Sequence, residues 1–237
     1  MGHEVHRRPG GIRACVTWRP VTQIQPRPDT PAAALAELLA GNARFVTGAR
    51  LHPHQDAERR AALVHGQRPF AVIFGCSDSR LAAEIIFDRG LGDLFVVRTA
   101  GHVVGPEVLA SIEYGVRVLG APLLVVLGHD SCGAVRAAYD ALTGVAAPGL
   151  APIVDRIAPR LPADLTTADL DAVAIGHVRR TVEELARSGL ADAVRSGACA
   201  IVGLTYRLAE GRVRVIAQAG SGLTGVGPVE SGLTGAA

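Results

Sequence analysis

The stretch "PFAVIFGCSDSR", residues 69–80, decides the fold. Its apolar part, residues 70–75, is short and continuous, as in strands that are buried on both faces of a parallel sheet. Two similar runs follow at residues 94–99 ("LFVVRT") and 122–128 ("PLLVVLG"). Residues 105–120, between these two runs, have Pro106 in the first turn, end with a glycine and have helical apolar spacing, which predicts a crossover helix. We therefore predict an α/β fold with a mainly parallel central sheet flanked by helices.

Both ends of the chain add elements to this sheet. Residues 198–206 and 212–218 are joined by "RLAEG", which predicts a hairpin with Gly211 in the turn and an antiparallel C-terminal edge strand. Near the start, residues 29–48 predict a helix that Gly48 ends, and so an N-terminal helical arm. Further helices are expected at residues 56–67, 134–142 and 171–189.

The composition along the chain predicts three regions. Residues 1–30 carry four prolines and are expected to form a flexible N-terminal extension. Residues 31–218 contain all the predicted strands and helices and are expected to form one α/β domain. Residues 219–237 are rich in glycine and contain "SGLTG" twice, which predicts a flexible tail rather than a repeat architecture.

The residue totals exclude several classes of protein. The formal net charge of +2 gives no reason to expect nucleic acid as a partner. No run of about eighteen apolar residues exists, so no membrane-spanning helix is expected. The first residues lack the apolar core of a secretory signal, and we expect a cytoplasmic protein. Four cysteines in such a chain indicate metal-binding or catalytic thiols rather than a disulfide scaffold.

Reactive side chains follow the first and third predicted strands. Cys76 follows the end of the first strand, and "GHDSCGAV", residues 128–135, brings His129 and Cys132 to the end of the third. Ligands of parallel sheets bind beyond the carboxyl ends of the strands, so neighbouring strands would bring these three side chains together. Two thiolates and one imidazole suit Zn²⁺, and three protein ligands leave a fourth position open, as in catalytic zinc sites. Asp78 could instead fill that position and close the site.

Simpler interpretations exist for each cluster alone. The residues around Asp78 suit any polar turn after a strand, and a buried cysteine is more often part of the core than a metal ligand. Arg80 beside Asp78 could be a surface ion pair of little energetic value. We favour the metal site because two such clusters occur, each at a predicted strand end and each with a cysteine. Next to a metal, Arg80 would keep Asp78 ionised and oriented.

The order of the motifs resembles that of the β-class carbonic anhydrases, and most closely their actinobacterial members. The resemblance extends over residues 32–218. The matching segments are "LLAGNARFVTG" (38–48), "CSDSR" (76–80), "GDLFVVRTAGHVV" (92–104), "SIEYGVRVLGAPLLVVLGH" (111–129), "HDSCGAV" (129–135) and "IVGLTYRLAEGRV" (201–213). Each zinc motif is moderately specific alone, and the ordered set is highly specific.

The resemblance implies a zinc enzyme that reversibly hydrates CO₂ to bicarbonate and a proton. Cys76, His129 and Cys132 would hold Zn²⁺, and the Asp78–Arg80 pair would orient a zinc-bound hydroxide as the nucleophile. Arg80 would keep Asp78 off the metal, and Asp78 would be a fourth ligand only in a closed state. The family also implies a homodimer, with a tetramer as a further possibility.

Some features leave alternatives open. Certain family members have a regulatory bicarbonate pocket of Trp, Arg and Tyr; Arg98 and Tyr206 match it here, but Ile73 stands where the Trp is expected. A hydrolase of carbon disulfide or carbonyl sulfide would carry the same motifs. A non-catalytic zinc-binding bicarbonate sensor is a third possibility, although it would not need the Asp78–Arg80 pair. His102 is the best of several weak candidates for a proton shuttle.

Overall fold

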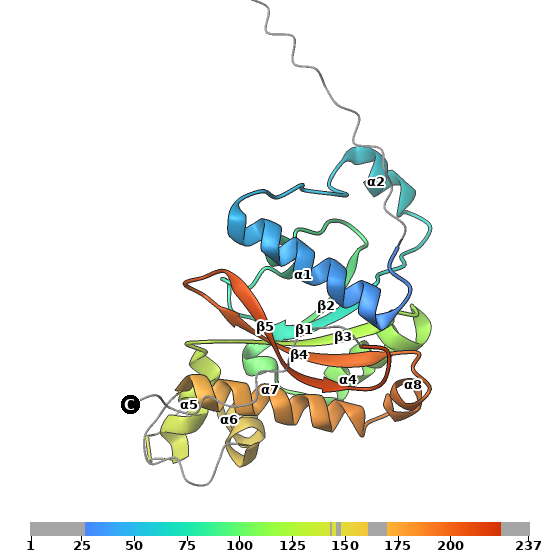
Figure 1. The fold of residues 1–237 in the computed structure, drawn as a ribbon. Coiled ribbons are helices and arrows are strands. Elements are labelled where there is room, and N and C mark those ends of the chain that lie inside the picture. The colour runs from blue at the N-terminus through green and yellow to red at the C-terminus, as the bar shows by residue number, and fades with distance from the viewer. Residues whose placement is uncertain (1–26, 143, 146–147, 161–169, 224–237) are drawn as a thin grey trace, which may run out of the picture.

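A five-stranded sheet forms the centre of the molecule, in the order β2-β1-β3-β4-β5 (Figure 1). The computed structural model describes residues 27–142, 144–145, 148–160 and 170–223. Strands β1 to β4 are parallel, and β5 runs antiparallel to β4 at the edge. This confirms the predicted fold class. The strands are β1 (Ala71–Cys76), β2 (Leu94–Thr99), β3 (Leu123–His129), β4 (Ala200–Arg207) and β5 (Arg212–Ala219).

Helices cover both faces of the sheet (Figure 1). On one face lies α1 (Pro31–Thr47), and on the other lie α4 (Pro106–Glu113) and α7 (Leu170–Ala186). The remaining helices are α2 (Ala57–Ala62), α3 (Ala83–Ile86), α5 (Gly133–Leu142), α6 (Ala151–Ile157) and α8 (Ala191–Arg195), with short 3₁₀ turns at Ala100–His102 and Ala158–Arg160. Within the described ranges, no helix is both long enough and apolar enough to cross a membrane.

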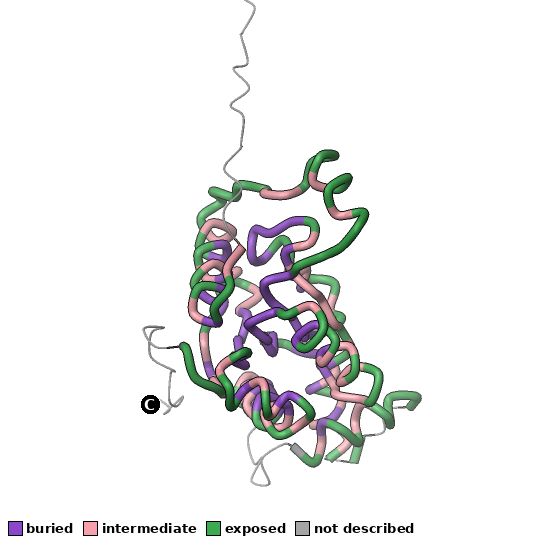
Figure 2. Tube along the Cα trace, turned by 90° about the vertical axis from the view of Figure 1, so that its right-hand side faces the viewer, coloured by how far each residue is buried: buried purple, intermediate pink, exposed green. Residues whose placement is uncertain are grey.

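Strands β1 and β3 are buried along their whole length, as their continuous apolar sequences predict. Alternate side chains point to opposite faces, so Val72 and Phe74 pack with α4 and α7 while Ile73 packs in the cluster that contains α1. Figure 2 shows the buried residues in the interior of the molecule and the exposed ones around its periphery. The two layers of core hold the carboxyl ends of β1 and β3 in a fixed relation.

The ends of α1 follow their local sequence. Thr30 Oγ1 accepts a hydrogen bond from the backbone N–H of Ala33, and Pro31 occupies the first turn. Gly48, with φ 73°, ends the helix in the left-handed conformation that glycine adopts without strain. The predicted stop at Gly48 is therefore confirmed. Gly211, with φ 68°, likewise lies in the turn of the predicted β4–β5 hairpin.

Two predicted helices differ from those observed. The crossover helix begins at Pro106 but changes to a π-helix at Tyr114–Val118, and α2 is shorter than the predicted 56–67. The π-helix is also a place of close packing: a Cβ on Gly115 would lie 2.6 Å from Val72 Cγ2, so the backbone here approaches β1 directly. Helix α2 buries none of its residues, so packing against the core does not extend it.

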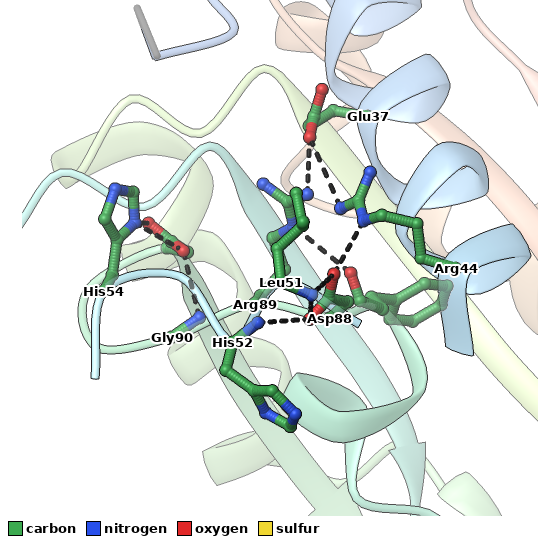
Figure 3. Close-up of polar contacts among 10 residues, drawn as sticks. Glu37, Arg44, Leu51, His52, His54, Asp88, Arg89 and Gly90 are labelled. Atoms are coloured by element: carbon green, nitrogen blue, oxygen red, sulfur yellow. Dashed lines mark hydrogen bonds and ion pairs between the residues drawn. The ribbon is translucent and has the colours of Figure 1, made fainter. Parts of the chain in front are cut away.

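The segment after α1 is fastened by a buried carboxylate (Figure 3). Asp88 accepts hydrogen bonds from the backbone N–H groups of Leu51 and His52 and from Arg44 Nε at 2.6 Å. Burial alone would raise the pKa of Asp88, but these donors hold it below its ordinary value. This contact fixes α1 against the turn that follows α3. Other contacts of the same cluster join Arg89 to Glu37, and His54 and Gly90 to Asp93.

The predicted boundaries of the terminal regions stay predictions. Residues 1–26 and 224–237 lie outside the described residues, and so does Cys15. Leu223, the last described residue, lies within the predicted tail and is buried in the core cluster that includes residues of α1.

Candidate metal centre

The site forms where two parallel strands end side by side. Cys76 is the last residue of β1 and His129 the last residue of β3. The two strands are hydrogen-bonded neighbours, with Gly75 opposite Leu127. Cys132 follows in the turn between β3 and α5. The predicted juxtaposition of the two clusters is therefore present.

The ligand-type atoms of Cys76, His129 and Cys132 all lie within 4.8 Å of one another. The two Sγ atoms are 4.0 Å apart. All three residues are buried, with 5%, 1% and 7% of their surface exposed. Over the residues that the structure describes, no other group of three or more histidine, cysteine or acidic side chains is clustered in this way. Such a set of soft sulfur and nitrogen donors matches the preference of Zn²⁺.

The imidazole of His129 is oriented for a metal. Its Nδ1 lies 2.7 Å from the carbonyl oxygen of Asp130, which can only accept a hydrogen bond. Nδ1 therefore carries the proton, and Nε2 has a free lone pair in the neutral ring. Nε2 is buried and has no hydrogen-bond partner among the described residues. A buried imidazole nitrogen without a hydrogen-bond partner, close to two thiols, is suited to bind a metal.

The two thiols differ in proton affinity. The hydrogen bond with Cys132 is the main cause that lowers the pKa of Cys76 well below the ordinary thiol value, and burial opposes it. The same contact raises the pKa of Cys132, and burial adds to that rise. Without a metal, the pair therefore favours one thiolate hydrogen-bonded to one thiol. A cation would allow both sulfurs to be thiolates.

Asp78 and Arg80 form a forked ion pair beside the cluster. Arg80 donates from Nε to one carboxylate oxygen of Asp78 at 2.9 Å and from Nη2 to the other at 2.6 Å. The backbone N–H of Arg80 adds a third bond at 2.9 Å. These side-chain hydrogen bonds are the main cause that holds the pKa of Asp78 well below its usual range. The carboxylate is thus ionised and fixed in direction by its neighbour two residues later.

Arg98 contributes contacts that the sequence did not predict. Its Nε donates to the carbonyl oxygen of Cys76 at 2.9 Å, and its Nη2 donates to that of Asp78 at 2.5 Å. The side chain thereby holds the backbone of the turn that carries the thiol and the carboxylate. An arginine within the otherwise apolar run "LFVVRT" is the sequence signal that could have suggested such a role.

Gly101 supplies a second unpredicted contact. Its backbone N–H donates to Cys76 Sγ at 3.3 Å. His102, the next residue, is 2% exposed, and its ring lies 4.2 Å from that of His177, centroid to centroid. The environment of His102 is thus that of a buried, packed ring.

Comparison with known proteins agrees with this geometry. The carbonic anhydrase family model matches residues 71–213. A carbonic anhydrase of Mycolicibacterium smegmatis is 52% identical over 191 residues, which cover 78% of this chain and 93% of that protein.

Solved structures resemble the fold as well. The β-carbonic anhydrase CafA of Aspergillus fumigatus is 28% identical with a TM-score of 0.57, covering 77% of this chain and 88% of that one. A tetrameric β-carbonic anhydrase of Sordaria macrospora is 23% identical with a TM-score of 0.61, covering 78% of this chain and 98% of that one. The family model spans more than half of this chain. The Mycolicibacterium protein is matched over nearly its own whole length. The chain is therefore an enzyme of the carbonic anhydrase family, with a β-class fold.

Proposed function

We propose that the enzyme binds one Zn²⁺ through Cys76, His129 and Cys132 and catalyses the reversible hydration of CO₂ to bicarbonate and a proton. The observation that carries the proposal is the arrangement of two buried thiols and one unsatisfied imidazole nitrogen around a common point. The Asp78–Arg80 pair follows Cys76 by only a few residues and completes the set.

Zinc, when bound, would supply Lewis acidity that makes a water molecule nucleophilic near neutral pH. The roles of the protein's own residues follow from their contacts. Asp78 is held ionised, so it can accept a hydrogen bond from the attacking water and set the direction of that water's lone pair. Arg80 occupies both carboxylate oxygens of Asp78, which favours a site whose fourth position stays open rather than closed by Asp78.

Arg98 would hold Asp78 and Cys76 at fixed positions relative to each other. It donates to the carbonyl oxygens of both residues, so the two side chains leave the backbone from fixed points. This contact also bears on the regulatory bicarbonate pocket of some relatives. Arg98 is engaged with the turn that carries the site, and Ile73, at the position where the Trp is expected, is a buried core residue. We propose that the enzyme is not regulated through such a pocket.

We further propose a homodimer as the basic assembly. Strand β2 lies at the edge of the sheet, and its apolar residues from Leu94 to Val97 are half-buried, whereas β1 and β3 are fully buried. An apolar edge strand is usually covered, because it otherwise invites uncontrolled pairing. The tetrameric Sordaria relative is in keeping with such an assembly. Sedimentation velocity should give at least a dimer; a monomer at all concentrations would contradict this part of the proposal.

Stopped-flow CO₂ hydration tests the reaction. The enzyme as purified should be active. It should lose activity after chelation of its metal and regain it when Zn²⁺ is added. Carbon disulfide and carbonyl sulfide are assayed side by side with CO₂, because a hydrolase of either compound would use the same motifs. Faster turnover of one of these two would assign the site to that substrate, and zinc binding without any turnover would indicate a bicarbonate sensor.

A further inference from the structure

The metal centre has a support on α7, a helix that contributes none of its ligand-type side chains. His177 of α7 is fully buried, and its Nε2 lies 2.7 Å from the carbonyl oxygen of Gly101. That oxygen can only accept, so Nε2 of His177 must carry the hydrogen and donate it. The residues are 76 positions apart in the chain. The contact therefore ties the helix to the turn beside Cys76.

The local sequence alone does not account for the conformation of this turn. Gly101 has φ 64° and His102 has φ 42°, so two successive residues adopt left-handed backbone conformations. A non-glycine residue in that region carries strain and persists where its surroundings impose it. The turn is also tightly enclosed, since a Cβ on Gly101 would lie 2.7 Å from Ile157 Cδ1 and 2.8 Å from Ala134 Cβ.

The same turn touches the proposed zinc ligand. The backbone N–H of Gly101 donates to Cys76 Sγ at 3.3 Å. Such N–H groups orient a ligand and tune its donor strength, and loss of an outer-shell partner typically weakens metal sites markedly. The direction of this N–H depends on the backbone torsions of Gly101, and His177 fixes the carbonyl group of the same residue.

Helix α7 can act as a rigid support because it is packed against the sheet. Val178 and Val182 belong to the buried cluster on this face, and both lie close to Gly203 of β4. The ring of His177 also lies against that of His102, at 4.2 Å between centroids, so it contacts the strained residue of the turn as well. Both contacts act on the turn from the same side chain.

We propose that His177 is a positioning residue of the metal centre: by donating to the Gly101 carbonyl it holds the Gly101 N–H on Cys76 Sγ. This inference rests on the proposed binding of zinc by Cys76. It assigns to His177 no contact with substrate and no transfer of a proton. Its effect is on how firmly the site holds a metal and on the electronic character of the Cys76 ligand.

The test compares three substitutions in the full-length enzyme. His177→Leu removes the donor, and His177→Gln keeps an amide N–H at a similar reach. Thr181→Val is the matched control, because Thr181 is also fully buried on α7 and donates to the His177 carbonyl oxygen without being in the site. If His177→Leu does not fold, His177→Asn replaces it, since asparagine is polar but too short to reach Gly101.

Two readouts separate a positioning role from general loosening of the fold. The first is the rate at which zinc passes to a colorimetric chelator, which we expect to rise about 10-fold in His177→Leu. The second is the thiolate-to-metal charge-transfer band of the Co²⁺-substituted enzyme, which should move to lower energy when the sulfur loses its N–H donor. Thr181→Val should match the unmodified enzyme in both, and His177→Gln should recover most of the difference.

The inference is overturned if the Leu variant equals Thr181→Val in both readouts, or if folded His177→Gln is no better than the Leu variant. Failure of the proposed function gives a different result. In that case the unmodified enzyme would not bind one Zn²⁺ per chain at all, before any variant is compared.

Discussion

Cys76 and Cys199 are both buried thiols, yet their surroundings give them opposite chemistry. Cys76 lies at the carboxyl end of β1, where Cys132 and several N–H groups lower its pKa. Cys199 precedes β4 at the other end of the sheet, is fully buried, and donates to the carbonyl oxygen of Ala200. Burial raises the pKa of Cys199 to about 12. Burial alone therefore does not make a reactive thiol; the neighbours that stabilise a thiolate do.

The two ends of the sheet differ in the same way. At the carboxyl ends, side-chain donors and acceptors converge on one point. At the amino ends, Arg27 donates to the backbone carbonyl oxygens of Arg68, Pro69 and Gly120. These contacts give hydrogen-bond partners to carbonyl groups that lie just before β1 and β3. The contrast follows the general rule that parallel sheets bind ligands beyond the carboxyl ends of their strands.

The largest effect is expected from exchanging sulfur for oxygen at the two cysteines. Cys76→Ser should lower the zinc content from about one per chain to near zero and abolish CO₂ hydration, because a serine hydroxyl is a poor ligand for Zn²⁺. Cys199→Ser should keep both zinc and activity. Metal analysis and stopped-flow assays check this pair. Equal zinc contents in the two variants would erase the distinction drawn between the thiols.

The next largest effect concerns two of the chain's arginine–aspartate pairs, one beside the metal centre and one on the exposed face of a helix. Arg80→Ala should keep zinc but reduce turnover by about 100-fold, since Asp78 loses the partner that directs it and can move onto the metal. Arg136→Ala removes a similar pair, with Asp140 on the exposed face of α5, and should change neither quantity. Zinc content and turnover are measured together. An Arg80→Ala enzyme of normal turnover would refute the role of Arg80.

A smaller effect is expected from pH. Two thiolates and a neutral imidazole cancel the formal charge of Zn²⁺, so the site should acidify water less than a three-histidine site does. CO₂ hydration should therefore increase between about pH 6.5 and about pH 9. Arg80 holds the pKa of Asp78 well below its usual range, so Asp78 is ionised throughout this interval and does not cause the rise.

The pH profile of the CO₂ hydration rate of Asp78→Asn distinguishes titration of the zinc-bound water from titration of the Asp78 carboxylate. Its rates should be lower at every pH but should rise over the same interval as those of the unmodified enzyme. A flat profile of the unmodified enzyme would contradict the proposed ligand set. A rise that vanishes in Asp78→Asn would assign the pH dependence to Asp78 instead.

The smallest effect is a difference in thiol labelling. In a Cys15→Ser background, a thiol reagent near neutral pH should leave Cys199 unmodified in the native protein, because burial keeps this thiol protonated and inaccessible. After chelation of the metal, Cys76 should become the most reactive thiol. Peptide mass spectrometry locates the label. Modification of Cys199 before Cys76 would reverse the comparison.

The sequence predicted the sheet well, because continuous apolar runs leave few alternatives to buried parallel strands. It also predicted that Cys76, His129 and Cys132 would lie together, since Cys76 and His129 each follow such a run. The π-helix at Tyr114–Val118 could not be predicted, because the apolar spacing of residues 105–120 is that of an ordinary α-helix and does not show how closely Gly115 approaches Val72.

The supporting contacts of the site were likewise beyond the sequence. Arg98 reaches the turn after β1 because β1 and β2 pair with Gly75 opposite Arg98. This pairing register cannot be determined from the sequence. The Gly101 N–H donates to Cys76 from a turn with two successive left-handed residues, and His177 reaches that turn from a helix far along the chain. The candidate ligands could be recognised from residue type and strand position, whereas the residues that support them come together only in the folded structure.

The central claim is that the ends of β1 and β3 together form one zinc centre with an open position. X-ray absorption at the zinc edge of the purified enzyme tests it most directly. We expect two sulfur neighbours at about 2.3 Å and two nitrogen or oxygen neighbours at about 2.0 Å, with one sulfur fewer in any residual zinc of Cys132→Ser. A zinc environment without sulfur, or with the same sulfur count in that variant, would contradict the account.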